Sequence, residues 1–258
     1  REATSNPFGV NVPLMYPEID KLMQILIEEK VKIVFTSAGN PALYTDFLHR
    51  HGITVAHVVS SSRFARKCEQ VGVDAVVAEG FEAGGHNGRE ETSTLCLIPA
   101  VRQATSLPLL AAGGIASGEA MAAVMLLGAE GVQVGSRFAL SKESSAHENF
   151  KRHCLNLQEG DTFLTLKKVS PIRLVKNEFC ESVENAQQRG ASIDELRELL
   201  GKGRAKKGIF EGDLQNGELE IGQVSAMVSS EQSAAEIIDD MISVYRDALK
   251  MDFERFSF

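Results

Sequence analysis

The sequence predicts an α/β protein built around a parallel β-sheet. Short, almost wholly apolar segments alternate with helix-like segments about six times over the first 160 residues. An apolar segment without strict alternation indicates a strand covered on both faces, as in parallel sheets. Glycines follow several of these segments directly and allow sharp turns at the strand ends. The 258 residues suffice for one large domain or two modest ones.

The strand–helix alternation can be followed element by element. Strands are expected at residues 8–12, 31–36, 54–59, 75–78, 107–112 and 131–134. Helices are expected at residues 17–30, 41–50, 61–71, 92–105, 117–127 and 143–158. Pro41 suits the first turn of its helix, and Gly72 suits the end of another. This spacing is that of repeated βα units, which form parallel sheets.

Two architectures contain such units: an open doubly wound sheet and a (β/α)8 barrel. Glycines follow three successive strands, after residues 79, 112 and 134. Phosphate-binding turns after late strands are typical of the barrel, whereas a Rossmann sheet carries its glycine fingerprint after the first strand. The sequence therefore favours a TIM barrel. Because it supplies about six strands and begins at Arg1, we expect the first two βα units to be missing from this chain.

The alternation stops after about residue 159. A helix is expected at residues 192–200, where Ser192 opens a capping box, and an amphipathic helix at 233–249. Residues 201–222 are rich in glycine and charge, as in a loop or lid. We therefore expect a barrel at residues 1–159, a small substrate or lid domain at 160–225, and a C-terminal helix at 226–258 that returns to the barrel.

Composition and charge limit the partners of the protein. A net charge of -8 and a pI near 5.4 argue against a nucleic-acid partner, which usually needs a basic face. The apolar segments are shorter than the roughly 18 residues of a membrane span, so no membrane partner is expected. Four cysteines show neither a CxxC pair nor metal-ligand spacing. Reduced thiols in a cytoplasmic protein without a metal site are expected.

The stretch from Asp74 to Gly88, DAVVAEGFEAGGHNG, is the first candidate for chemistry. A buried strand runs into a loop in which four glycines surround His86. A histidine changes protonation near neutral pH, so His86 is the candidate general acid or base; the alternative is a loop histidine bonded to backbone. Glu79 and Glu82 lie in the same loop. We expect one of them to bond a ligand or a neighbouring backbone N–H; the alternative is a solvated loop charge.

Two further motifs predict a phosphate site. Gly113–Gly114 and Gln133–Ser136 follow consecutive strands. Backbone N–H groups of glycine turns form anion-binding nests, and the Ser136 hydroxyl adds a donor. The alternative is that a barrel needs glycines at tight turns anyway, but the pair on adjacent strands favours a phosphate-bearing ligand. Asn11 ends its strand at the same rim, where it either holds a polar ring edge or caps a turn.

Three motifs resemble those of one enzyme family: AEGFEAGGHNG (78–88), AAGGIASG (111–118) and GVQVGSRF (131–138). They resemble the nitronate monooxygenases, formerly 2-nitropropane dioxygenases, a family that includes the FMN-dependent enoyl-acyl-carrier-protein reductase II of bacterial fatty-acid synthesis. FGVNVPL (8–14) and EGDLQNGELEIGQV (211–224) look like the reductase branch. The resemblance extends over essentially the whole chain, in order.

The resemblance implies an FMN-binding TIM barrel with a small substrate domain and with NADH or NADPH as electron donor. It implies that His86 is the catalytic histidine. It also implies a set of flavin-lining residues, which comprises Asn11, Glu79, Gly84, Gly85, Gly113, Gly114, Gln133, Gly135 and Ser136. The family's glycine–methionine turn on its first strands is absent from this sequence, in agreement with the strand count.

Two activities and two substrate classes stay open at this point. In the reductase branch the resemblance implies hydride transfer to the β-carbon of an acyl-carrier-protein-linked trans-2-enoyl thioester, which His86 positions or supplies with the α-proton. In the monooxygenase branch it implies that His86 abstracts the α-proton of a small nitro substrate or binds a nitronate. A barrel that only binds phosphate ligands is the third alternative. A homodimer is a further expectation.

The reductase is preferred for two reasons. The tail at residues 211–224 resembles that branch, and a basic cluster suits an acidic carrier protein. This cluster comprises Lys202, Arg204, Lys206 and Lys207. A solvated basic loop is the alternative explanation for it.

Overall fold

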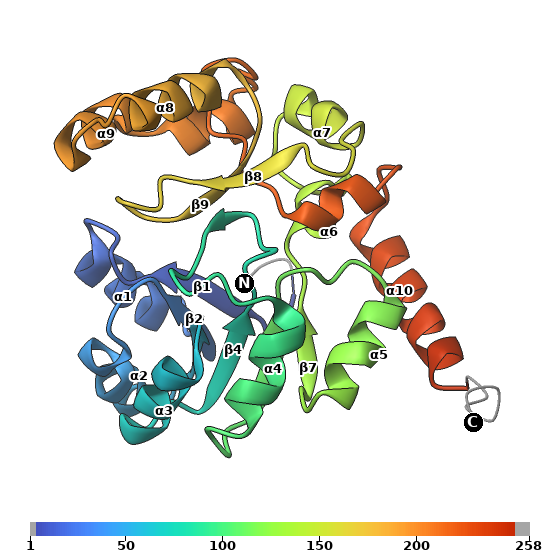
Figure 1. Cartoon of the computed structure of the whole chain (residues 1–258). Helices are drawn as coiled ribbons and strands as arrows, with labels where there is room; N and C mark the ends of the chain where they lie inside the picture. Colours follow the sequence, from blue (N-terminus) through green and yellow to red (C-terminus); the bar gives the residue numbers. More distant parts are fainter. Residues whose placement is uncertain (1–3, 251–258) are drawn as a thin grey trace.

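Six parallel strands form the main sheet of the computed structural model, which describes residues 4–250 (Figure 1). They are β1 (Gly9–Pro13), β2 (Ile33–Ser37), β3 (Thr54–Val59), β4 (Ala75–Glu79), β6 (Leu109–Ala112) and β7 (Gly131–Gln133). The sheet order is β1-β2-β3-β4-β6-β7, and every pair is parallel. The predicted strands are therefore confirmed. The outer ends of the first and third predicted parts, residues 1–3 and 251–258, lie outside the described residues.

The sheet is an open arc with helices on its outer side (Figure 1). The covering helices are α1 (Ile19–Glu28), α2 (Thr45–Arg50), α3 (Ser62–Gln70), α4 (Thr94–Arg102) and α5 (Gly118–Leu126). Val34, Val55 and Val76 are wholly buried between sheet and helices. β-Branched residues favour strands because they pack well on a pleated surface, which explains why these short segments form the sheet. Every carboxyl end of a strand lies at the same rim of the arc.

Two predicted helices differ in extent from the expectation. The helix expected at 41–50 begins as a 3₁₀ turn, Pro41–Leu43, before α2, because the Asn40 side chain accepts a hydrogen bond from the Ala42 N–H and caps a tighter turn. The helix expected at 143–158 is only α7 (Glu148–Cys154). His147 has an extended backbone and accepts from the Asn149 N–H, so it ends the irregular segment before α7.

A second, antiparallel sheet was not predicted. β8 (Thr162–Thr165) and β9 (Ile172–Val175) pair with each other, and β9 also pairs with β5 (Gly85–His86). The predicted catalytic loop is therefore a strand of this sheet, although it belongs to the first predicted part. β5 has only two residues, and glycine and histidine are not typical strand formers. No sequence pattern distinguishes such a segment from a loop.

β9 and the region after it form a separate apolar cluster. It contains α8 (Glu178–Gln188) and α9 (Ile193–Leu200), and its buried members include Leu174, Phe179 and Leu196. The predicted capping box of α9 is confirmed: Ser192 Oγ accepts from the Glu195 N–H at 3.2 Å, and the Glu195 carboxylate accepts from the Ser192 N–H at 2.7 Å. The predicted loop at 201–222 contains one π-helical turn, Lys206–Phe210. The divisions at residues 160 and 225 stay predictions.

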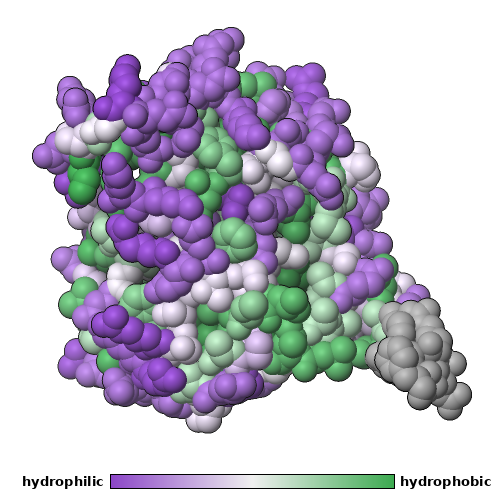
Figure 2. All heavy atoms as spheres, in the orientation of Figure 1, coloured by the Kyte–Doolittle hydropathy of each residue, from purple (hydrophilic) through white to green (hydrophobic). Residues whose placement is uncertain are grey.

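The last helix, α10 (Ala234–Ala248), packs against α5. A Cβ at Gly118 would lie 2.1 Å from the Tyr245 backbone nitrogen, so glycine is needed for this close approach. On the apolar face of this predicted amphipathic helix, Ile237 and Met241 are buried, but Ile238 and Ile242 are 47% and 38% exposed. The buried stripe is thus narrower than expected. Apolar colouring also gathers over α4 and α5 in Figure 2. No helix within residues 4–250 has the length and apolarity to cross a bilayer.

The basic cluster predicted at residues 202–207 is largely paired within its own region. Lys206 lies 3.3 Å from Glu211, and Lys207 lies 3.0 Å from Asp213. Arg204 donates to the carbonyl oxygens of Leu199, Leu200 and Asn216 and stacks over the Phe179 ring. Within the described chain, only Lys202 of the four has no recorded partner. The cluster therefore offers an acidic partner less free charge than the sequence suggested.

Candidate functional site

Two adjoining cavities lie at the carboxyl ends of the parallel strands. The smaller has a volume of about 250 Å³ and the larger about 700 Å³. Glu79, Gly84, Gln133 and Glu220 line both, so the two cavities meet at these residues. This end of a parallel α/β sheet is where ligands bind in barrels and in open sheets alike.

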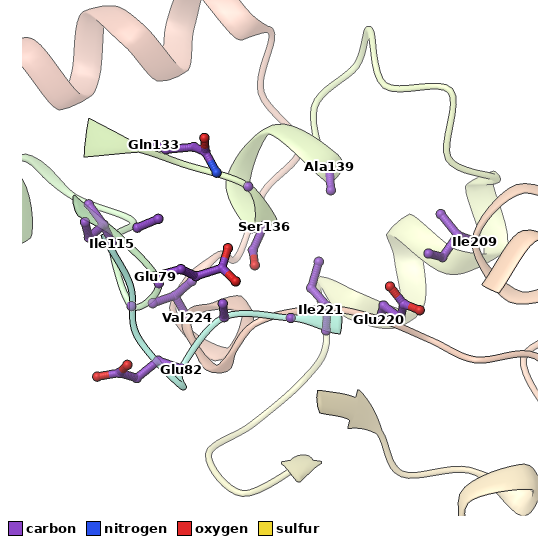
Figure 3. A pocket seen from close by; sticks show the side chains of 16 residues that line it. Glu79, Glu82, Ile115, Gln133, Ser136, Ala139, Ile209, Glu220, Ile221 and Val224 are labelled. Carbon is purple, nitrogen blue, oxygen red and sulfur yellow. The ribbon is translucent and has the colours of Figure 1, made fainter. Parts of the chain in front are cut away.

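All of the predicted site residues line these cavities. Those on the smaller cavity, shown in Figure 3, are Glu79, Gly84, Gly113, Gly114, Gln133, Gly135 and Ser136. Those on the larger cavity are Asn11, Glu79, Gly84, Gly85, His86 and Gln133. Residues from four different strand ends thus meet in one continuous space. Their roles toward a flavin or a substrate stay predictions.

The turn after β6 requires glycine at residue 113. Its φ is +84°, and a Cβ built there would lie 2.6 Å from the carbonyl oxygen of Gly80. Gly80 in turn donates its N–H to the Ala112 carbonyl at 2.9 Å. The loops after β4 and β6 therefore pack backbone against backbone. This contact places the glycine loop that carries His86 beside the Gly113–Gly114 turn.

Backbone donors line one part of the smaller cavity, although the carboxyl-bearing residues Glu79, Glu82 and Glu220 line it as well. Within residues 4–250, the backbone N–H groups of Gly114, Gly135 and Ser136 donate no recorded hydrogen bond. A Cβ built at Gly135 would meet no atom within 4 Å, so the space beside it is open. Among the described residues that line this cavity there is no lysine or arginine. A phosphate group held here would be bound mainly by backbone donors.

The Ser136 hydroxyl is already engaged on one side. Its Oγ accepts a hydrogen bond from the Gly222 N–H at 2.9 Å, a contact that sequence reasoning missed. A Cβ at Gly222 would lie 2.7 Å from the same Oγ, so glycine is needed there. The hydroxyl proton donates to no residue of the described chain. Ser136 is therefore still able to donate to a ligand while it holds the segment around Gly222.

The Glu82 carboxylate is hydrogen-bonded to Thr94 and is not free to bond a ligand in the cavity. Its carboxylate accepts from the Thr94 N–H at 3.0 and 3.1 Å and from Thr94 Oγ1 at 3.0 Å. Figure 3 shows its side chain directed away from Glu79 and Ser136. This confirms, for Glu82, the expectation that one loop carboxylate bonds a neighbouring backbone N–H. It fixes the start of α4 and with it the shape of the glycine loop.

Several polar side chains of the cavity walls have no recorded hydrogen bond within residues 4–250. They are Asn11, Glu79, His86, Gln133 and Glu220. Asn11 and His86 are exposed, whereas Glu79, Gln133 and Glu220 are half-buried and line both cavities. Polar groups inside a protein are normally paired, so these three half-buried side chains mark a candidate ligand site. Burial raises the pKa of Glu79 to about 7. Desolvation by the surrounding protein lowers the pKa of His86, which keeps the imidazole neutral at pH 7.

The position of His86 is set by the second sheet. Gly85 and His86 pair with Arg173 and Ile172 of β9. The Arg173 side chain is 2% exposed and donates from Nε and Nη2 to the Phe81 carbonyl at 3.1 and 2.9 Å. Arg173 therefore ties the beginning of the His86 loop to β9. Nothing in the sequence distinguished it from the other basic residues nearby.

His57 is a second histidine on the larger cavity. It is 4% exposed, and its Nδ1 lies 2.6 Å from Thr36 Oγ1. Burial and the nearby Lys67 lower its pKa to about 4. A neutral, buried histidine held by one hydroxyl is a structural residue.

Glu220 lies on both cavities, and sequence reasoning did not single it out. Burial, with a smaller contribution from Glu218, raises its pKa to about 7. The nearest sequence signal was its place within the motif at 211–224. A carboxyl group with an unfavourable environment and no protein partner is a common mark of a functional site.

We expect Glu220→Gln to stabilise the ligand-free protein at pH 8 but not at pH 5. The folded-state pKa of about 7 exceeds the ordinary value of 4.5, so the folded state binds more protons and loses stability as the pH rises between these values. Glutamine does not titrate, so Glu220→Gln removes this loss of stability at high pH. Thermal unfolding at both pH values measures it, with Glu211→Gln as the exposed control. An equal shift of the melting temperature at both pH values would contradict the expectation.

This chain is similar to known proteins over nearly its whole length. The family model for nitronate monooxygenase matches residues 1–243. The structure of FabK from Thermotoga maritima aligns with a TM-score of 0.91 and 36% identity, and the match covers 96% of this chain and 79% of that one. A nitroalkane oxidase from Streptomyces ansochromogenes aligns with a TM-score of 0.81 and 27% identity, covering 96% and 83% of the two chains.

A further relative is named for a different substrate. It is the (3aS,4S,5R,7aS)-5-hydroxy-7a-methyl-1-oxo-octahydro-1H-indene-4-carboxyl-CoA dehydrogenase of Rhodococcus jostii, which is 27% identical over 96% of this chain and 79% of its own length. The name of that enzyme describes an acyl-CoA thioester. Similar proteins thus include ones named for thioester substrates and ones named for nitro compounds.

Proposed function

Since this chain belongs to the nitronate monooxygenase family of flavin-dependent oxidoreductases, we propose that it is an FMN-dependent enoyl-acyl-carrier-protein reductase. The observation that carries this proposal is the match to FabK, an enoyl-acyl-carrier-protein reductase II, at 36% identity over 96% of the chain. We further infer that the six-stranded arc is part of a (β/α)8 barrel, in which two more strands would stand between β7 and β1.

The residues present fit FMN. The N–H groups of Gly114, Gly135 and Ser136 would hold the phosphate, because these residues line the smaller cavity and the N–H groups have no recorded partner in the described chain. The unpaired side chains of Asn11 and Gln133 would bond the polar edges of the rest of the cofactor. When bound, FMN supplies hydride transfer from a nicotinamide donor to an acceptor carbon. The protein binds and orients both.

His86 would act on the acceptor in the larger cavity. Because its imidazole is neutral at pH 7, its N–H is able to donate a hydrogen bond to the thioester carbonyl oxygen, where negative charge develops when the β-carbon accepts a hydride. This role fits the lowered pKa better than donation of the α-proton, which needs an imidazolium. Pairing with β9 fixes the backbone of His86, and the imidazole has no recorded partner in the described chain.

A second candidate function is oxidation of nitronates or nitroalkanes with oxygen. The family model and the nitroalkane oxidase structure favour it. A neutral imidazole is also the form of His86 that accepts an α-proton from a nitroalkane. The two functions therefore use the same residues and differ in the acceptor.

The two candidates are separated by following the flavin in the absence of oxygen. We expect NADH or NADPH to bleach the bound flavin and a short trans-2-enoyl thioester to restore its absorbance rapidly. Stopped-flow absorbance measures both steps, and the saturated thioester is the control acceptor. A flavin that neither nicotinamide reduces, but that a nitronate does reduce, would move the assignment to the monooxygenase.

A further inference from the structure

The segment from Leu219 to Gln223 carries a carboxyl group to the junction of the two cavities. The Leu219 carbonyl accepts from the Val175 N–H, and the Gln223 N–H donates to the Glu82 carbonyl, each at 2.9 Å. Together with the Gly222–Ser136 hydrogen bond, these contacts tie the segment to β9, to the glycine loop and to the turn after β7. Glu220 is therefore held at a fixed place between the anchored ends of the segment.

The Glu220 carboxylate lies over the strand that carries His86. A Cβ built at Gly85 would come within 2.7 Å of Glu220 Oε2. Figure 3 shows Glu79 and Glu220 on opposite sides of the smaller cavity. Because Glu220 also lines the larger cavity together with His86, a group that reaches His86 passes close to this carboxyl.

No cation neutralises Glu220 within the described chain. Arg204 acts on Glu218 instead, and the buried Arg173 bonds the Phe81 carbonyl. Lys67 is the one lysine or arginine among the described lining residues, and it lies on α3, where it acts on His57. The ionisable groups around Glu220 are thus the carboxyls of Glu79 and Glu218 and the neutral imidazole of His86.

From this arrangement we propose that Glu220 makes the acceptor cavity selective for substrates whose reacting end is uncharged, and that it excludes anionic ones. The proposal rests on the proposed function, which places the acceptor beside His86. An ionised carboxylate in a partly desolvated cavity repels a second negative charge strongly. An enoyl thioester is neutral at its reacting end, whereas a nitronate is an anion.

The selectivity depends on the protonation of Glu220. With a pKa near 7, its side chain is mostly ionised at pH 8.5 and mostly protonated at pH 5.5. Exclusion of anions is therefore strong at the higher pH and weak at the lower one. Glu79 has a similar pKa and acts in the same direction, so some exclusion remains when Glu220 alone is neutral.

Crotonamide and crotonate form a matched pair of probes, since they share the enoyl chain and differ in charge. Calorimetric titration of the flavin-loaded protein at pH 8.5 is expected to show crotonamide binding at least about tenfold more tightly than crotonate. Glu220→Gln should reduce this ratio to below about threefold. Lowering the pH to 5.5 should reduce it in the unaltered protein as well.

Glu218→Gln is the control, because Glu218 directly precedes the segment and lines neither cavity. It should leave the ratio at pH 8.5 unchanged within about twofold, since Glu220 is already ionised there. A ratio near one in the unaltered protein, or a ratio that Glu220→Gln leaves unchanged, would overturn the proposal. These binding ratios are measured without any reaction. They therefore test the proposal even if the enoyl thioester does not reoxidise the reduced flavin.

Discussion

Gly135→Asp is expected to lower the affinity of the protein for FMN by more than about 100-fold, because two like charges near 4 Å repel by several kcal/mol at protein surfaces. The position is open: a Cβ there meets no atom within 4 Å. Its φ of -102° suits any residue. The substitution therefore adds a carboxylate beside the predicted phosphate nest without a clash in the ligand-free fold. Fluorescence titration of FMN measures the loss.

Two controls separate charge from damage to the fold. Gly135→Ala adds volume without charge and should weaken FMN binding less than Gly135→Asp does. Ser229→Asp adds the same charge at an exposed residue outside both cavities and should have no effect on FMN binding. Equal affinity for FMN in Gly135→Asp and the unaltered protein would show that the phosphate does not lie in the smaller cavity.

His86→Gln is expected to slow transfer to the acceptor by about 10²- to 10⁴-fold, the usual contribution of a positioned acid–base group. Reduction of the flavin by the nicotinamide should change little, because His86 is assigned to the acceptor. FMN binding should also persist, since the phosphate nest lies on other strands. Stopped-flow measurement of the two half-reactions separates these effects.

The matched control is His51→Gln. His51 is exposed at the end of α2, bonds the Phe47 carbonyl, and lies outside both cavities. It should leave both half-reactions unchanged. If His86→Gln slowed both half-reactions equally, His86 would be a residue of the flavin site and not of the acceptor site.

The strands and the glycine turns could be predicted from the sequence because their causes are local. Val34, Val55 and Val76 belong to short β-branched runs that fit a buried parallel sheet. Gly113 follows a strand directly and adopts φ of +84°, which an L side chain rarely adopts. In parallel sheets such strand ends share one rim, so the candidate residues could be grouped before their distances were known.

The features that could not be predicted from the sequence depend on contacts between residues far apart in the chain. β5 is a strand only because β9 pairs with it 86 to 88 residues later, as the register Gly85↔Arg173 and His86↔Ile172 shows. Glu220 reaches the cavity because Gly222 bonds Ser136, also 86 residues away. Neither pairing leaves a periodic pattern in the sequence. The pairing of β5 and the place of Glu220 were therefore harder to predict than the parallel strands and the glycine turns.

We propose that the adjoining cavities hold a flavin phosphate at one end and an acceptor beside His86 at the other. A crystal structure of the protein with FMN tests this proposal. The phosphate is expected within hydrogen-bonding distance of the N–H groups of Gly114, Gly135 and Ser136, with His86 facing the remaining space of the larger cavity. A phosphate bound elsewhere, with those N–H groups left unpaired, would contradict it.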